Sequence, residues 1–194
     1  MLKFDEQKQL DSVNGALALR GQIESIVDDI CKKGYRNICW LGIGGTYASC
    51  LQAEIHMKER SGINFYVENA AEYLVTGNRK VGEGTVVIIS SVTGSTSEMV
   101  DGVRKAQEDG AVVIGFVDVA DTKLAKMVDH LISFPLNEQL KFFMTADRFM
   151  YNAGEFDEYN ELYSELEQHL AAALVEVEKS ADELGQRIAQ KHMN

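Results

Sequence analysis

The chain has 194 residues, 45% of them hydrophobic, which suits one globular domain with a helical appendage. Its 30 acidic and 19 basic residues give a formal net charge of -11, which argues against nucleic acid or an anionic membrane surface as a partner. No apolar stretch is long enough to span a membrane, and the first residues lack the basic and apolar regions of a signal peptide. We therefore expect a cytoplasmic protein.

The cysteines point to the same compartment. Cys31, Cys39 and Cys50 are odd in number and show no Cys-x-x-Cys spacing. Such a set is typical of buried, reduced thiols rather than of a disulfide framework or a zinc site. We expect no metal and no cofactor.

The N-terminal segment, residues 1–34, is predicted to be helical. Between residues 5 and 33 apolar side chains recur with the three- and four-residue spacing of an amphipathic helix. Gly34 follows two lysines and should end the helix. Gly15 and Gly21 weaken its middle, so a break there is compatible with the pattern.

Residues 37–42 (Asn-Ile-Cys-Trp-Leu-Gly) predict a strand that is apolar on both faces, and a glycine-rich loop follows it. Gly42 and Gly44 begin the dinucleotide fingerprint GxGxxG, but its third glycine would fall at Tyr47. Glu68, at the end of the next strand, stands where a ribose-binding acid is expected, so the dinucleotide hypothesis stays open. A purely structural tight turn is another alternative. A P-loop is excluded, because the chain contains no Gly-Lys-Ser/Thr.

A helix is predicted over residues 46–60. Leu51, Ile55 and Met57 are its candidate core positions, and His56 should lie at or near the surface. A further strand over 64–68 and a short helix over 69–75 lead to the most informative stretch of the chain.

That stretch is residues 85–98. Val86 to Ile89 predicts a fully buried parallel strand, and the composition then changes within one residue to hydroxyls around Gly94. The hydroxyl side chains are Ser90, Ser91, Thr93, Ser95, Thr96 and Ser97. A strand that ends in a small-residue loop and opens a helix presents free N–H groups and a positive dipole end, where phosphate commonly binds. Alternatively, Ser95 and Glu98 form a capping box that only starts the helix.

The remaining strands are predicted over residues 110–117 and 128–134, with His130 of the second one exposed. Strands that alternate with helices at this spacing predict a three-layer α/β/α sandwich with a five-stranded parallel, flavodoxin-like sheet. Both glycine-containing loops lie at carboxyl ends of strands, where such sheets bind ligands.

Beyond Pro135 the pattern is wholly helical, with helices predicted over residues 140–151 and 156–191. The second would be about 50 Å long, longer than the domain it packs on. Part of its apolar stripe should therefore face another subunit or another lobe, and we expect a homodimer or higher oligomer. The predicted divisions are a helical segment (1–34), a ligand-binding domain (35–135) and C-terminal helices (136–194).

Two loops of this chain, Gly44-Gly-Thr-Tyr47 and Ser91-Val-Thr-Gly-Ser-Thr-Ser-Glu98, resemble the phosphosugar-binding loops of the SIS (sugar isomerase) domain family. The resemblance covers roughly residues 5–190 and is greatest to fructosamine and glucoselysine 6-phosphate deglycases. It implies a sugar phosphate or a 6-phosphofructosamine as ligand. The implied phosphate contacts are Ser91, Thr93, Ser95 and Thr96. The implied sugar contacts are Gly45 and Thr46.

The resemblance also implies what this chain lacks. Deglycases of this kind have two SIS lobes, and their general acid and base, a glutamate and a histidine, come from the second lobe. No second strand–hydroxyl-loop unit occurs here, so we expect an N-terminal lobe with connector helices that does not turn over substrate alone. Glu72, which resembles an acidic residue near the family's site, and Glu98 are the candidate catalytic residues. The alternative function is a non-catalytic sugar-phosphate sensor.

Overall fold

The structure is a computed structural model that describes residues 5–192, and in them the chain forms one five-stranded sheet. The strands are β1 (Asn37–Gly42), β2 (Phe65–Asn69), β3 (Thr85–Ser91), β4 (Val112–Val117) and β5 (His130–Ile132). All neighbours pair in parallel, in the order β2-β1-β3-β4-β5. The predicted parallel sheet with flavodoxin-like strand order is confirmed.

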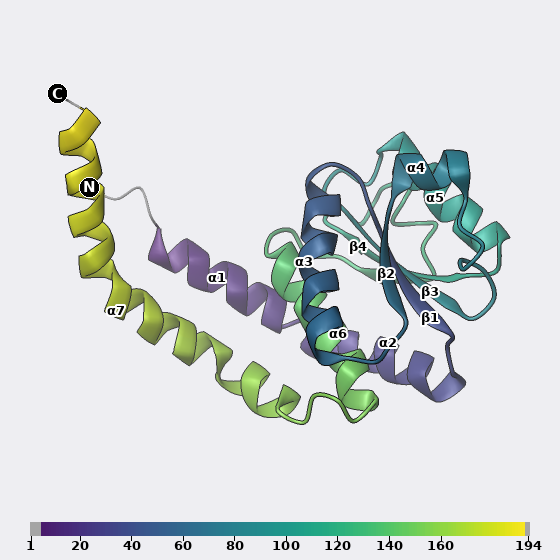
Figure 1. Cartoon of the computed structure of the whole chain (residues 1–194), viewed down its shortest axis with the longest axis horizontal. Helices are drawn as coiled ribbons and strands as arrows, with labels where there is room; N and C mark the ends of the chain where they lie inside the picture. Colours follow the sequence, from purple (N-terminus) through teal and green to yellow (C-terminus); the bar gives the residue numbers. More distant parts are fainter. Residues whose placement is uncertain (1–4, 193–194) are drawn as a thin grey trace.

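The described part of the chain contains seven helices; five of them cover the sheet, whereas the first and the last project away from it (Figure 1). The seven helices are α1 (Glu6–Leu17), α2 (Arg20–Lys33), α3 (Gly45–Arg60), α4 (Ala70–Thr76), α5 (Ser97–Glu108), α6 (Glu138–Asn152) and α7 (Tyr159–His192). Helices α2, α3 and α6 pack on one face of the sheet, and α4 and α5 pack on the other. The α/β/α sandwich is therefore confirmed.

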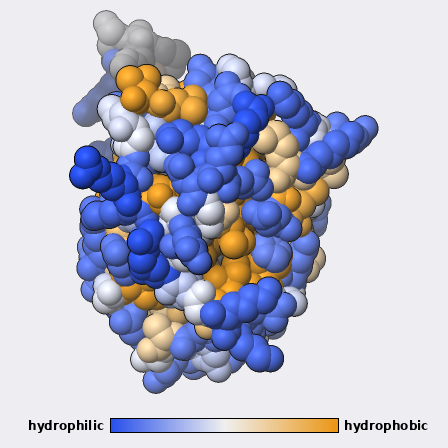
Figure 2. Space-filling model, turned by 90° about the vertical axis from the view of Figure 1, so that its right-hand side faces the viewer, coloured by the Kyte–Doolittle hydropathy of each residue, from blue (hydrophilic) through white to orange (hydrophobic). Residues whose placement is uncertain are grey.

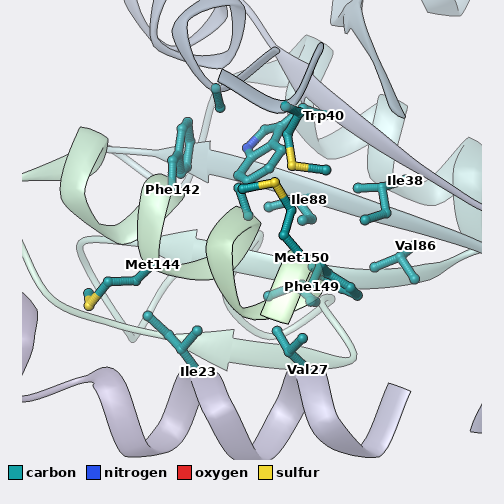
Figure 3. Close-up of a cluster of buried hydrophobic side chains, with 14 of the residues drawn as sticks. Ile23, Val27, Ile38, Trp40, Val86, Ile88, Phe142, Met144, Phe149 and Met150 are labelled. Atoms are coloured by element: carbon teal, nitrogen blue, oxygen red, sulfur yellow. The ribbon is translucent and has the colours of Figure 1, made fainter. Parts of the chain in front are cut away.

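The three central strands, β1, β3 and β4, are mainly apolar because helices cover both faces of the sheet. In β1, Ile38 and Trp40 enter the core under α2, α3 and α6, whereas Cys39 and Leu41 enter the core under α4 and α5. The ring centroids of Trp40 and Phe142 of α6 lie 4.8 Å apart at the centre of the first core (Figure 3). Alternate side chains of one buried strand thus fill two separate cores.

The predicted N-terminal helix is broken, but the break falls at neither glycine. α1 ends at Leu17 and α2 begins at Arg20, while Gly15 lies inside α1. A Cβ at Gly15 would lie 1.9 Å from the ring of Phe134. This glycine therefore lets α1 approach residues 133–137, the segment between β5 and α6 that we call the strap. The break lets α1 leave the sandwich and pack beside α7, to which Asn14 donates a 2.9 Å hydrogen bond at Glu167.

Two further side-chain predictions need correction. Met57 is buried as expected, but Ile55 is 59% exposed, because the buried stripe of α3 contains Ala53 and Met57, one turn apart. His130 is half-buried rather than exposed. His56 is half-buried, as expected, and its Nε2 lies 2.5 Å from the Asp147 carboxylate.

Helix α7 runs beside α1 and extends well beyond the sandwich (Figure 1). It begins at Tyr159, later than the predicted residue 156, and Phe156 is buried in the turn before it. Farther along, Val175, Leu184 and Ile188 are 68%, 53% and 49% exposed. The side of the molecule opposite α7 shows hydrophilic residues with hydrophobic patches between them (Figure 2). None of the helices in residues 5–192 is long and apolar enough to cross a membrane.

Candidate functional site

A cavity of about 620 Å³ lies at the carboxyl ends of β1, β3 and β4. Its walls are the β1–α3 loop, the β3–α5 loop, Asp118 directly after β4, and the segment that leads into α6. The helix after β1 packs on one face of the sheet and the helix after β3 on the other, so the cavity lies at the topological switch point. Five of the six predicted contact residues line it: Gly45, Thr46, Ser91, Thr93 and Thr96.

The β3–α5 loop is held in shape by Ser91 and Gly94. The Ser91 hydroxyl is buried and accepts a 3.0 Å hydrogen bond from the Gly94 N–H, which leaves its own proton free to donate. Gly94 has φ +62°, and a Cβ there would lie 2.1 Å from Oγ1 of Thr122. Its carbonyl accepts from the Leu124 N–H at 3.1 Å. Only glycine fits this position.

Helix α5 begins at this loop without a side-chain cap. Thr96 is its N-cap residue, yet no side chain of residues 5–192 caps the first-turn N–H groups. The alternative interpretation, a capping box of Ser95 and Glu98, is therefore not supported: Glu98 instead accepts from the Ser97 hydroxyl at 2.8 Å. The Thr93 and Thr96 hydroxyls lie 3.5 Å apart in the cavity wall. The uncapped N-terminus and these two hydroxyls form a cluster of uncharged donors.

Ser95 differs from the other predicted phosphate contacts. Its side chain is exposed and does not line the cavity, and its N–H donates to Thr93 Oγ1 at 3.4 Å. Ser97 is also exposed outside the cavity. Of the six hydroxyls in this stretch, Ser90, Ser91, Thr93 and Thr96 line the cavity.

The β1–α3 loop uses its glycine and its threonine structurally. A Cβ at Gly42 would lie 2.7 Å from the backbone of Tyr47, so Gly42 lets the first turn of α3 approach β1 closely. The Thr46 hydroxyl accepts from the Ile43 N–H at 3.1 Å and donates to the Ile43 carbonyl at 2.9 Å. Glu68, the expected ribose-binding acid, accepts from Asn78 and does not line the cavity.

Sequence analysis missed the acidic wall of the cavity. Glu138, in the first turn of α6, accepts a hydrogen bond from the Ser90 hydroxyl, and Asp118 lies beside it. Lys141 is 1% exposed, and its ammonium donates to the Phe134 carbonyl at 2.7 Å and to Asp118 at 3.4 Å. Asp118 had a local signal, because it directly follows a buried strand. No local sequence signal marked Glu138 or Lys141.

Burial shifts the pKa of both members of this ion pair. Burial raises the pKa of Asp118, although the nearby Lys141 ammonium acts in the opposite direction. Burial also lowers the pKa of Lys141, although Asp118 acts to raise it. In each case loss of hydration outweighs the attraction between the two charges.

Comparison with known proteins identifies the fold family. The SIS domain model matches residues 33–146, more than half of the chain. The chain belongs to the SIS domain family. A curated relative, glutamine–fructose-6-phosphate aminotransferase (isomerizing) of Sulfurisphaera tokodaii, is 27% identical over 110 residues. That match covers 57% of this chain but only 18% of the aminotransferase.

Solved structures share the SIS fold at low sequence identity. A candidate phosphosugar isomerase from Bacillus subtilis has a TM-score of 0.78 at 18% identity, over 91% of this chain and 57% of that one. The C-terminal domain of glucosamine-fructose-6-phosphate aminotransferase from Francisella tularensis has a TM-score of 0.71 at 13% identity, over 92% of this chain and 56% of that one. A candidate phosphosugar isomerase from Bacteroides fragilis has a TM-score of 0.58 at 17% identity, over 80% of this chain and 93% of that one. The chain thus spans little more than half of the first two.

The two candidate catalytic residues of this SIS domain lie outside its cavity. Glu72 is exposed in the first turn of α4, and its N–H donates to Asn69. Glu98 bonds to the neighbouring Ser97 hydroxyl. Neither lines the cavity, whereas Asp118 and Glu138 do. Helix α6 therefore contributes to the cavity, although we predicted the ligand-binding domain to end at residue 135.

Proposed function

We propose that this SIS domain binds a sugar phosphate and holds its phosphate against the β3–α5 loop. The observation that carries the proposal is the donor cluster of Ser91, Thr93, Thr96 and the uncapped α5 N-terminus in one cavity wall. No lysine or arginine of the described chain lines this cavity. In a protein of net charge -11, neutral hydroxyls and a helix dipole can hold an anion without a basic cluster. The B. subtilis and B. fragilis neighbours, both described as candidate phosphosugar isomerases, support a sugar phosphate as ligand.

We further propose that the protein is a deglycase or isomerase for sugar phosphates of the fructosamine 6-phosphate type. Proton transfer on such a substrate needs a positioned acid and base. Because Glu72 and Glu98 lie outside the cavity, we propose that a second lobe or a partner chain supplies these groups. Two structural neighbours contain much more chain than is matched here, which supports a second lobe.

A sugar-phosphate sensor is the second candidate function, favoured by the same position of Glu72 and Glu98. Amine release from a 6-phosphofructosamine separates the two functions. The deglycase hypothesis predicts turnover by the assembled protein and none by residues 1–194 alone. Binding without turnover in every assembly would favour the sensor.

A thermal-shift titration tests ligand binding directly. A ligand at about 100 times its Kd stabilises the folded state by roughly 2.7 kcal/mol, which corresponds to about 5–10 °C in Tm for a chain of this size. Fructose 6-phosphate should produce this shift, and fructose should not. An equal shift with NAD would instead support the dinucleotide hypothesis, and no shift with any sugar phosphate would refute the proposal.

We also propose that α7 makes this chain a homodimer or higher oligomer. Val177, Leu184 and Ile188 are each about half exposed, and their spacing of seven and four residues places them on one side of α7. They form an apolar stripe that self-association would cover. Light scattering of the wild type should report a mass above 21.6 kDa, and the triple substitution of these residues by serine should lower it to the monomer mass. A wild-type monomer over a wide concentration range would refute the proposal.

A further inference from the structure

Two parts of the cavity wall differ in chemistry: Ser91, Thr93 and Thr96 form what we call the hydroxyl end, and Asp118 and Glu138 form what we call the carboxylate end. Glu138 lines the carboxylate end, and its Oε2 accepts from the Ser90 hydroxyl. No other hydrogen bond or ion pair to Glu138 occurs within residues 5–192, so Oε1 remains available. An ionised carboxylate only accepts hydrogen bonds. This end therefore suits a ligand group that donates them.

The backbone before Glu138 is forced into an uncommon conformation. Leu136 and Asn137 have φ +77° and +49°, and they are the only non-glycine residues with positive φ in the described chain. Asparagine tolerates this region, but leucine does not adopt it readily, so the surrounding structure must hold Leu136 in this conformation. Both line the cavity. The strained turn brings Glu138 to the cavity wall.

Lys141 holds this turn in place from behind. Its buried ammonium joins the Phe134 carbonyl, on one side of the turn, to Asp118 at the end of β4. Because Lys141 lies in α6 only one turn after Glu138, the ion pair fixes the helix that carries the carboxylate. Asp118 has Lys141 as its partner, whereas no basic side chain of residues 5–192 pairs with Glu138.

We propose that Glu138 is the specificity-determining residue that binds the hydroxyl or amine groups at the non-phosphate end of the ligand. This inference rests on the proposed function, because it assumes that the phosphate occupies the hydroxyl loop. It assigns the two ends of the cavity to the two ends of one molecule. Glu138 then distinguishes a sugar phosphate from inorganic phosphate, which lacks the sugar hydroxyl or amine groups that would reach the carboxylate.

Isothermal titration with fructose 6-phosphate and with inorganic phosphate tests this assignment. Glu138→Gln keeps the size of the side chain but replaces an accepting oxygen with a donating amide. We expect affinity for fructose 6-phosphate to fall about 10- to 100-fold, the loss of a charge-assisted bond, while affinity for inorganic phosphate does not fall. Glu108→Gln, the same change at the exposed end of α5, should leave both affinities unchanged.

Any other outcome contradicts either the role of Glu138 alone or the proposed function as well. An unchanged affinity for fructose 6-phosphate, or an equal loss for both ligands, overturns the role of Glu138 and leaves the proposed function standing. Wild type that binds neither ligand overturns the proposed function and this inference together. If Glu138→Gln lowers Tm sharply, the variant Ser90→Ala is tested in its place. This variant lacks the hydroxyl that orients the Glu138 carboxylate, so it should bind fructose 6-phosphate more weakly and inorganic phosphate as well as wild type does. If it binds fructose 6-phosphate as tightly as wild type, the inference is overturned.

Discussion

The two ends of the cavity are built in different ways. The hydroxyl end comes from one short stretch, Ser91 to Thr96, whose shape depends on a hydrogen bond between residues three apart. The carboxylate end joins Ser90 to Glu138, 48 residues away, and Asp118 to Lys141, 23 residues away. A site made of consecutive residues can be recognised in a sequence. A site made where strand ends and a distant helix meet depends on the order of the strands.

The two ends also differ in the interactions that stabilise them. Uncharged groups form the hydroxyl end, and its side-chain hydrogen bonds join residues of the same loop. The carboxylate end depends on a buried charge, Lys141. Substitutions at the first should therefore affect mainly binding, and substitutions behind the second should affect mainly folding.

Replacing the buried lysine should have the largest effect. Lys141→Met leaves the half-buried Asp118 carboxylate and the Phe134 carbonyl without their donor, and breaking such a pair costs about 3 kcal/mol. Urea unfolding measures this loss. The double substitution Lys141→Met with Asp118→Asn removes the orphaned charge and should regain part of the stability. A loss below about 1 kcal/mol would mean that the ion pair does not hold the strap.

Gly94→Ala should be the most damaging single change in the hydroxyl loop. The new Cβ meets Thr122 and the backbone has φ +62°, so we expect about 2 kcal/mol of destabilisation and loss of fructose 6-phosphate binding. Gly154→Ala is the matched control. Its φ is +74° but no described residue lies within 4 Å of the new Cβ, so it should cost only the backbone strain of about 1 kcal/mol and leave binding intact. Equal effects of the two would show that the contact with Thr122 is unimportant.

Within the loop, Ser91→Ala should weaken fructose 6-phosphate binding about 10- to 100-fold, since a hydrogen bond to a charged acceptor contributes about 1.5–3 kcal/mol. Thr96→Ala should act similarly. Ser97→Ala removes an exposed hydroxyl outside the cavity and should change nothing. Titration calorimetry compares the three variants. A comparable loss in Ser97→Ala would place the ligand elsewhere.

The smallest effect concerns two acids that contact the same helix, α6. The Arg148 hydrogen bond lowers the pKa of Asp28, so Asp28 stabilises the fold above its unfolded pKa of about 3.9 and loses this contribution as pH falls through its folded pKa. Burial raises the pKa of Asp118, so its ionisation in the fold costs stability as pH rises from about 3.9 through its folded pKa. The two acids should therefore respond to acid in opposite directions.

Unfolding between about pH 3 and pH 7 measures this contrast. Relative to wild type, Asp28→Asn should lose less stability on acidification, and Asp118→Asn should lose more, because it lacks the group that gains protons in the fold. Asp28 is 41% exposed, so its contribution should be well under about 1 kcal/mol. Responses in the same direction would contradict the assigned causes of the two pKa shifts.

Much of the fold and the hydroxyl end could be predicted from local pattern. The runs Ile38 to Leu41 and Val86 to Ile89 are apolar at every position, and only a strand covered by helices on both faces needs that pattern. The abrupt change from β3 to hydroxyls and Gly94 marks the loop, because its conformation depends on the residues within it. These features are encoded in consecutive residues.

Tertiary structure alone decided the rest. Which hydroxyls line the cavity, Thr96 but not Ser95, depends on where α5 begins, and the packing of α3 left Ile55 exposed. Glu138 lies in the cavity because the strap after β5 turns through two left-handed residues that Lys141 secures to Asp118. No periodicity or motif reports a contact between residues so far apart, since that contact exists only once β4 has paired between β3 and β5 and α6 has packed against them.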